Sequence, residues 1–269
     1  MITGKTSVYA VFGNPVEHSL SPVIHNYGFS TLGIDAVYVA FKADNAKIVA
    51  DSIRGLGIKG ASITIPFKID IINYLDELDD NARLIGAVNT IVNEDFRLIG
   101  KNTDGIGALI ALKEVSSVNN KTVMILGYGG AARAIAFTLI DKVNKIYVYG
   151  RNESKAASLI EDLDRFSGYK KVFFTNSLVD YDILINTTPL GMNDEIPVPV
   201  DFILPKTVVF DIVYRPKDTN LIKEAKKVGC SIVYGYKMLL YQALEQFRIW
   251  TSKNIPQDLE NLLLQSLYS

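Results

Sequence analysis

The sequence has few of the residues that build disulfide bonds or zinc sites. Its 269 residues include one cysteine, Cys230, and two histidines, His18 and His25. A single cysteine excludes an internal disulfide framework and suits a reducing compartment. Structural zinc sites usually take four histidine or cysteine ligands, whereas this chain has three such residues in all, so a His/Cys zinc site is not expected. We therefore expect no metal site and a cytoplasmic location.

Long apolar runs and an excess of one charge are missing as well. No apolar stretch approaches the roughly 20 residues of a membrane-spanning helix, and no small-residue cleavage site of a signal peptide follows the first 13 residues. The 28 basic and 29 acidic residues leave a net charge of −1, which gives no sign of a nucleic-acid or membrane partner. Nothing in the sequence indicates an oligomeric partner. We expect a soluble protein whose partner is a small-molecule substrate.

The chain does contain two successive alternations of strand and helix patterns. The first predicts strands over 7–13, 35–43 and 60–66, helices over 21–33, 46–57 and 67–78, and a hairpin over 87–102. The second predicts strands over 122–127, 145–151, 183–189, 207–214 and 231–235, and helices over 105–115, 129–141, 238–253 and 257–267. Strands that alternate with helices imply a mostly parallel sheet covered on both faces. We predict an α/β protein of two domains.

A glycine-rich turn in the second alternation indicates a dinucleotide site. Gly127, Gly129 and Ala132 have the spacing G-x-G-x-x-G/A, directly after a predicted strand and at the start of a predicted helix. Glycine lets the backbone approach a pyrophosphate, which then lies at the helix N-terminus. The alternative is a tight turn without a ligand. The complete strand–turn–helix–strand unit of about 30 residues favours a dinucleotide.

The end of the next strand selects the type of dinucleotide. NAD sites usually carry an acid about 20 residues after the glycines, which binds the ribose 2′-hydroxyl. This chain instead has Gly150-Arg151-Asn152, with Lys155 beyond. A guanidinium pairs well with a 2′-phosphate, so we predict NADP. The alternative is a solvated basic helix start.

Polar residues also follow a later strand. Asn186, Thr187 and Thr188 lie at the carboxyl end of the strand predicted over 183–189, where open α/β sheets bind ligands. We expect them to contact the cofactor. The alternative is that they cap the strand end and its turn.

In the first alternation, two serines stand at a predicted helix start. The hydroxyls of Ser19 and Ser21, together with helix N-terminal amides, make a site for a small carboxylate. Ser21 before Pro22 is also a good N-cap, and for Ser21 alone this is the favoured interpretation. We expect His18 and His25 to be structural rather than catalytic.

Helix capping gives no reason for Lys68. It stands at the predicted start of the helix over 67–78, where the helix dipole opposes a positive charge. Asp104 also precedes a predicted helix and is an N-cap on the simplest interpretation. A lysine near a carboxylate is nevertheless a competent proton-transfer pair. With the amide of Asn89, these groups suit a small polyhydroxy acid.

Eight motifs in unbroken order resemble the shikimate dehydrogenase family of aromatic biosynthesis. They are NPVEHSLSPVIHN (14–26), GASITIPFK (60–68), GAVNT (86–90), NTDGIG (102–107), GYGGAARA (127–134), INTTPLGM (185–192), DIVYRP (211–216) and GYKMLLYQA (235–243). The resemblance runs from about residue 8 to about residue 250. It implies NADP-dependent interconversion of 3-dehydroshikimate and shikimate, in the chorismate route to aromatic amino acids. It also implies a substrate domain at 1–104, to which 238–269 return, and a Rossmann-type doubly wound NADP domain at 105–237.

The resemblance assigns roles position by position. Ser19 and Ser21, with help from Tyr214, would hold the substrate carboxylate. The ring hydroxyls would contact Thr64, Lys68, Asn89, Asp104 and Gln242, and Lys68 and Asp104 would be the catalytic pair. The cofactor contacts would be Gly127, Tyr128, Gly129, Gly130, Ala131, Arg151, Asn152, Lys155, Thr187, Thr188 and Gly235, with the pyrophosphate along 127–133.

Three positions depart from the family pattern, and none of them belongs to the catalytic pair. Gly150 stands where asparagine commonly precedes the arginine, Lys155 replaces a frequent arginine, and Lys237 replaces a small residue.

Hydride transfer to a ketone leaves an alkoxide, which a positioned ammonium stabilises and protonates. We therefore predict that Lys68 donates this proton.

Three other functions stay open on the sequence. A quinate/shikimate dehydrogenase that uses NAD would share most motifs, although the missing acid argues against NAD. A methylene-tetrahydrofolate dehydrogenase would need a pterin pocket, for which Ser19 and Ser21 give no reason. An NADP-sensing regulator without turnover would not need Lys68 and Asp104.

Overall fold

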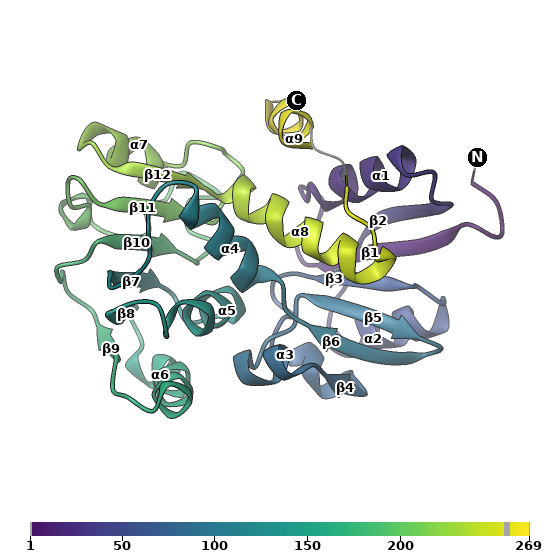
Figure 1. Cartoon of the computed structure of the whole chain (residues 1–269), viewed down its shortest axis with the longest axis horizontal. Coiled ribbons are helices and arrows are strands. Elements are labelled where there is room, and N and C mark those ends of the chain that lie inside the picture. The colour runs from purple at the N-terminus through teal and green to yellow at the C-terminus, as the bar shows by residue number, and fades with distance from the viewer. Residues whose placement is uncertain (1, 256–258, 269) are drawn as a thin grey trace. The chain divides into compact units, whose positions relative to one another are not determined.

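The computed structural model describes residues 2–255 and 259–268 (Figure 1). The chain forms two compact units, and each is considered by itself. The first unit comprises the residues up to Thr103 together with those from Gln242 onward, and the second comprises Asp104–Tyr241. The first unit is therefore discontinuous in sequence, and α8 (Gly235–Thr251) contributes residues to both units.

The first unit contains a six-stranded sheet in the order β2-β1-β3-β5-β6-β4. Its strands are β1 (Ser7–Gly13), β2 (Ala36–Lys42), β3 (Gly60–Ile63), β4 (Glu77–Leu78), β5 (Thr90–Glu94) and β6 (Arg97–Lys101). Its helices are α1 (Ser21–Thr31), α2 (Ala46–Gly55), the 3₁₀ helix η1 (Asp70–Tyr74), α3 (Asp80–Ile85), the later part of α8 and α9 (Leu259–Tyr268). β1 is parallel to β2 and β3, so the carboxyl ends of β1 and β3 lie at the same edge of the sheet.

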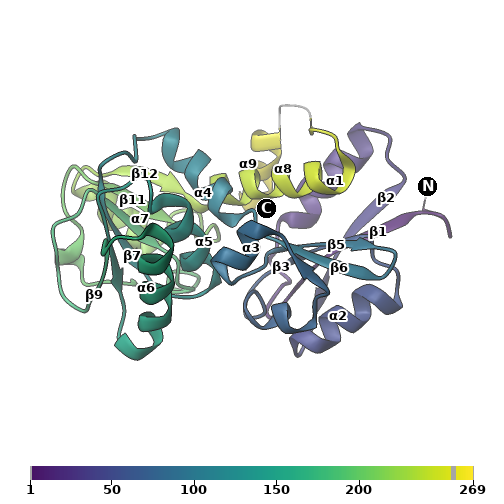
Figure 2. The same cartoon turned by 60° about the horizontal axis from the view of Figure 1, so that its bottom comes forward.

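Alternate residues of β1 face two different helix layers. Ala10 and Phe12 belong to the apolar core that packs on α2. Tyr9 points the other way, and its ring lies 5.1 Å from that of Phe29 in α1 and 5.4 Å from that of Trp250 in α8. Figure 2 shows α2 on one side of this sheet and α1 with α8 on the other. The period-2 pattern of a strand buried on both faces explains this arrangement.

The second unit contains a six-stranded parallel sheet in the order β12-β11-β10-β7-β8-β9. Its strands are β7 (Thr122–Leu126), β8 (Lys145–Tyr149), β9 (Val172–Thr175), β10 (Ile183–Asn186), β11 (Val208–Asp211) and β12 (Ser231–Tyr234). Its helices are α4 (Asp104–Lys113), α5 (Gly130–Leu139), α6 (Glu153–Ser167), the 3₁₀ helix η2 (Val200–Phe202), α7 (Asn220–Lys227) and the first part of α8. The strand order reverses between β7 and β10, which is where doubly wound sheets bind dinucleotides.

The predicted fold class is confirmed, but one predicted helix is absent. The segment 67–78 is not an α-helix; it forms a turn, then η1, then the edge strand β4. The elements α3, α6, α7 and β9 were not predicted, and the first two residues of the helix predicted over 257–267 lie outside the described residues. None of the described helices has both the length and the apolar character that crossing a bilayer requires.

Candidate active site

Lys68 lies in a turn after β3 rather than at the start of an α-helix. The next helical element is η1, a five-residue 3₁₀ helix with Ile69 as its N-cap. The expected opposition between the lysine charge and a helix dipole is therefore wrong, because one short turn sums few peptide dipoles. The turn is held from both sides: the amide of Phe67 donates to the carbonyl of Thr64 (3.0 Å), and that of Val88 donates to the carbonyl of Lys68 (2.7 Å). Lys68 is thus tied to the loop that carries Asn89.

The side chains of Asn89 and Gln242 are in contact, although 153 positions separate them in sequence. Nδ2 of Asn89 donates to Oε1 of Gln242 (3.2 Å) and to the hydroxyl of Thr103 (2.9 Å). Its Oδ1 accepts from the backbone amide of Thr103 (2.8 Å). Asp104, which is buried at the first position of α4, follows Thr103 directly. The structure therefore brings together Asn89 and Gln242, as the resemblance implied.

Ser21 is not the N-cap of α1. It is the first helical residue, and Leu20 occupies the cap position without a side-chain hydrogen bond. Ser21 is buried, and its side chain forms a hydrogen bond with the phenol of Tyr38. Burial of Tyr38 raises the pKa of this phenol, and its hydrogen bonds with Ser62 and Ser21 partly offset the rise. The hydroxyl of Ser21 thus pairs with a phenol rather than with the helix start. Ser19 accepts a weak hydrogen bond (3.3 Å) from the Ser21 amide.

Gly13, the last residue of β1, leaves space for the side chain of Thr64, which follows β3. The amide of Thr64 donates to the carbonyl of Phe12 (2.9 Å). An ideal Cβ on Gly13 would lie only 2.3 Å from Cγ2 of Thr64. Glycine at position 13 therefore allows the threonine side chain to lie against the end of β1.

His25, in α1, is fully buried. Its ring stacks on that of Tyr38 with a centroid distance of 4.4 Å. Burial lowers its pKa to about 3, so the ring is neutral. These contacts agree with the structural role expected for it. His18 is half-buried in the loop before α1.

In the second unit, the glycine turn between β7 and α5 has the geometry that a pyrophosphate needs. Gly127 has φ +99°, and an ideal Cβ there would lie 3.0 Å from both Oγ1 of Thr187 and Cγ2 of Thr188. Gly129 is the N-cap of α5, and no side chain caps the helix. The first turn of α5 thus has no capping side chain, the arrangement in which a helix N-terminus can bind a phosphate group. Tyr128, Gly130 and Ala131 complete this turn.

The threonines opposite this turn are held by two buried side chains. Oδ1 of Asn186 accepts from the amide (3.0 Å) and the hydroxyl (2.7 Å) of Thr188, and its Nδ2 donates to Oδ1 of Asp211 (2.9 Å). The hydroxyl of Thr187 donates to the carbonyl of Leu126 (2.6 Å). These hydrogen bonds confirm that the segment orders the strand end and its turn, and its contact with the cofactor stays a prediction.

Asp211 is a buried, hydrogen-bonded acid that sequence reasoning did not single out. Its carboxyl group accepts from the hydroxyl of Thr219 (2.7 Å), the amide of Val213 (3.0 Å) and Asn186. Burial raises the pKa of Asp211 to about 6, despite these three hydrogen bonds. An acid at the end of an apolar strand, facing an asparagine at the end of the next strand, was the available signal.

The basic residues after β8 are exposed at the start of α6. Asn152 caps this helix, because its Oδ1 accepts from the amide of Lys155 (3.0 Å). Arg151 and Lys155 make no ion pair with any residue that the structure describes. Arg133 differs, since its guanidinium lies 2.6 Å from Asp162 of α6. Arg151 and Lys155 are thus placed to meet an anion, whereas Arg133 is engaged within the protein.

Gly235 and Lys237 lie at the start of α8. An ideal Cβ on Gly235 would lie 2.4 Å from the carbonyl oxygen of Ile212, so only glycine permits this close approach. The ammonium of Lys237 lies 3.1 Å from a carboxylate oxygen of Glu114. The departure at position 237 is thus accommodated by an ion pair with the turn that follows α4. Tyr214 is half-buried in the loop after β11.

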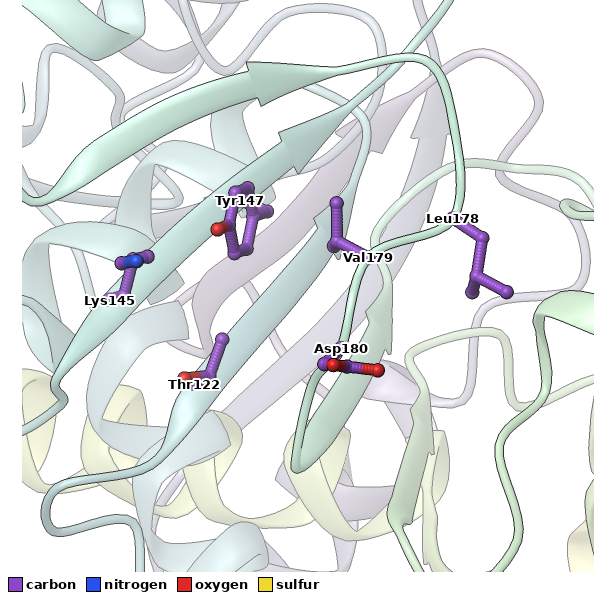
Figure 3. A pocket seen from close by; sticks show the side chains of 6 residues that line it. All are labelled: Thr122, Lys145, Tyr147, Leu178, Val179 and Asp180. Carbon is purple, nitrogen blue, oxygen red and sulfur yellow. The ribbon is translucent and has the colours of Figure 1, made fainter.

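A hollow of about 610 Å³ lies elsewhere in the second unit (Figure 3). It is lined by Thr122, Lys145, Tyr147, Leu178, Val179 and Asp180. Thr122 and Lys145 are the first residues of β7 and β8, so the hollow is at the amino ends of these strands. Since Gly127 and Arg151 follow the carboxyl ends of the same strands, the hollow is separate from the glycine turn.

Three family models match successive parts of the chain. The model described as shikimate dehydrogenase substrate binding domain matches residues 11–91. The model described as shikimate / quinate 5-dehydrogenase matches residues 109–191, and that described as shikimate 5'-dehydrogenase C-terminal domain matches residues 235–259.

The chain is also similar to curated proteins and solved structures over nearly its whole length. It is 46% identical over 264 residues to the shikimate dehydrogenase (NADP(+)) of Methanocaldococcus jannaschii, with 93% of each chain covered. It is 45% identical over 282 aligned positions to that of Methanobrevibacter smithii, with 99% of each covered. A crystal structure of a shikimate dehydrogenase in complex with NADP+ matches with a TM-score of 0.90 at 41% identity, covering 100% of this chain and 96% of the other.

Proposed function

This chain belongs to the shikimate dehydrogenase family, and we propose that Lys68 and Asp104 transfer the proton in its reaction. The reaction is the NADPH-dependent, reversible reduction of 3-dehydroshikimate to shikimate in aromatic amino acid biosynthesis. We assign substrate binding to the first unit and NADP binding to the second. The carrying observation is the hydrogen bond from Val88 to the carbonyl of Lys68, which ties the lysine to the loop that holds Asn89 against Gln242.

The second unit fits NADP on three counts. Gly127 leaves space that any side chain would fill, the first turn of α5 has no side-chain cap, and Arg151 and Lys155 are exposed beyond β8. The cofactor supplies a hydride when it is bound. The protein's part is to hold the pyrophosphate on the α5 amides and the 2′-phosphate on Arg151, with Lys155 as a second cation. Thr187, Thr188 and Gly235 bound the far side of this site.

Each side chain that we assign to the substrate has a distinct task. Ser19, Ser21 and Tyr214 hold the carboxylate of the substrate, and Thr64, Asn89 and Gln242 orient its ring hydroxyls. When the ketone carbon gains a hydride, its oxygen becomes an alkoxide. The Lys68 ammonium stabilises this charge and gives up its proton to the oxygen; in the reverse direction the neutral amine accepts the proton. Asp104 binds a neighbouring hydroxyl and stabilises the charged form of the lysine.

The proposal includes shikimate rather than quinate as the preferred substrate and NADP rather than NAD as the preferred cofactor. Purified protein is assayed with each of the four combinations, following reduced cofactor at 340 nm. We expect kcat/KM to be highest by far for shikimate with NADP. A higher kcat/KM with quinate than with shikimate would overturn the proposed substrate preference. Equal kcat/KM values with NAD and NADP would overturn the assignment of Arg151 to the 2′-phosphate. A cytoplasmic location completes the proposal, because the lone Cys230 suits a reducing compartment.

A further inference from the structure

The face of the first sheet that packs on α1 and α8 contains a continuous chain of buried hydrogen bonds. The hydroxyl of Tyr38 donates to Oγ of Ser62 (2.6 Å), and the hydroxyl of Ser62 donates to Oε1 of Gln246 (2.8 Å). Gln246 is 0% exposed and Ser62 is 6% exposed, so both side chains lie in the interior of the first unit. The ring of Tyr38, at one end of this chain, lies 4.4 Å from that of His25 and 6.1 Å from that of Trp250. Polar groups are costly in such a place unless each one is paired.

Gln246 carries this chain to the substrate loop. Its Nε2 donates to the carbonyl of Asn89 (3.0 Å) and to the hydroxyl of Thr90 (2.9 Å). The hydroxyl of Thr90 in turn donates to Oδ1 of Asn89 (2.7 Å). A single glutamine therefore holds both the backbone and, through Thr90, the side chain of Asn89.

One backbone group determines which atoms of the Asn89 side chain donate and accept. A backbone N–H can only donate, so the bond from the Thr103 amide identifies Oδ1 of Asn89 as the acceptor. Nδ2 of Asn89 is therefore the donor to Oε1 of Gln242.

We propose that Gln246 is a positioning residue, which sets the orientation of the substrate-binding amides of Asn89 and Gln242. Gln242 and Gln246 are four residues apart in α8, so their side chains lie on the same side of the helix. The bonds from Gln246 to Asn89 and Thr90, and from Asn89 to Gln242, then fix both amides against the loop after α3. The inference rests on the proposed function, because it requires that Asn89 and Gln242 bind shikimate.

The test uses the full-length protein with Gln246→Leu, which keeps the bulk of the side chain and removes its hydrogen bonds. Misoriented binding groups weaken the substrate in its ground state and transition state alike, so KM should rise while kcat changes little. We expect KM for shikimate to rise roughly five- to tenfold, the effect of about one lost hydrogen bond. The Kd for NADP should stay within about twofold of wild type, because the glycine turn is on the other unit.

Phe247→Leu is the matched control. Phe247 is the next residue of α8 and is also fully buried, but it has no side-chain hydrogen bond to lose. It should lower the thermal unfolding temperature and leave KM for shikimate unchanged. A rise in KM for this variant equal to that of Gln246→Leu would mean that general loosening of α8 is the cause, and would overturn the proposal.

A double-mutant cycle separates positioning from stability. Gln242→Met removes the amide that Gln246 is proposed to orient, so the KM effect of Gln246→Leu should be smaller in that background than in wild type. Equal fold-changes in the two backgrounds would overturn the proposal. If Gln246→Leu does not fold, Ser62→Ala takes its place in every comparison, with an expected rise of about threefold in KM for shikimate. An unchanged KM for Ser62→Ala would then overturn the proposal.

Different results would overturn the proposed function and the proposed role of Gln246. Absence of shikimate turnover by the wild-type protein would overturn the proposed function. Normal wild-type turnover, with an unchanged KM in Gln246→Leu, would overturn the role of Gln246 alone.

Discussion

The ring of Tyr128 occupies the space that a side chain at position 150 would need. An ideal Cβ on Gly150 would lie 2.7 Å from Cε1 of Tyr128. The tyrosine belongs to the glycine turn after β7, and Gly150 follows the neighbouring strand β8. The departure from the family pattern at position 150 is thus matched to a tyrosine in the turn, and the two residues form one packing unit.

Gly150→Ala should therefore disturb the cofactor site. The added methyl group must displace Tyr128, and the tyrosine is half-buried, so the effect belongs at the low end for an overpacked site. We expect a three- to tenfold rise, on the order of 1 kcal/mol, in the Kd for NADP. Titration calorimetry on the folded variant measures it. In a Tyr128→Ala background the same glycine substitution should have no further effect, and an undiminished effect there would contradict the account.

Arg151→Ala should weaken NADP far more than NAD. The guanidinium has no ion-pair partner within the described part of the chain, and the 2′-phosphate that it is proposed to bind is missing from NAD. Loss of a charge-assisted hydrogen bond corresponds to roughly a 10- to 150-fold rise in Kd for NADP. Lys155→Ala should act in the same direction with a smaller effect. Arg165→Ala, at an exposed arginine on the same helix, is the control, and a parallel loss for both cofactors in Arg151→Ala would show a structural role.

His25→Phe should make the protein less sensitive to acid. In the unfolded chain the imidazole takes up a proton below pH 6.5, whereas in the folded protein burial lowers its pKa to about 3. The unfolded state therefore binds more protons between these values, and the free energy of unfolding falls with falling pH by up to about 1.4 kcal/mol per pH unit. Urea unfolding at pH 7, 6 and 5 should show a smaller decline for His25→Phe than for wild type. His18→Asn is the control, and equal declines for wild type and His25→Phe would refute the assignment.

The sequence carried enough local information for most strands and for the cofactor turn. Apolar runs such as Thr122–Leu126 predicted buried parallel strands, and the glycine spacing placed the turn that follows. The helical spacing of apolar residues over 67–78 correctly predicted which side chains are buried, but the α-helix that it predicted does not form. Phe67 and Ile71 are buried, and Leu78 packs against the same core, but the chain reaches these positions through a turn, η1 and an edge strand. Apolar spacing reports which side chains are inside and does not by itself determine the path between them.

The parts of the site that could not be predicted depend on partners far apart in sequence. Ser62 and Gln246 are separated by 184 positions, so no local pattern could pair them. Ser21 was read as an N-cap because it precedes a proline, but a buried phenol offers its hydroxyl a partner that the sequence does not reveal. Asp211 likewise gains its role from Asn186 on the adjacent strand.

Asp104→Asn should slow turnover without adding to the effect of a Lys68 substitution. If both residues serve one proton transfer, the double variant should be about as slow as the slower single variant. Measured kcat values for the two single variants and the double variant test this. Rate losses that multiply would mean that the two side chains act separately.

The central claim is that the ammonium group of Lys68 supplies the proton, and Lys68→Met tests it most directly. Methionine keeps much of the apolar stem and deletes the charge. The control is Lys59→Met, which removes an exposed lysine from the same unit. The measurement is kcat with shikimate and NADP, together with the Kd for NADP and a thermal unfolding curve for each variant. The account predicts that kcat of Lys68→Met falls by about 10²- to 10⁴-fold with NADP affinity and folding intact, and a folded Lys68→Met enzyme with near-normal kcat would contradict it.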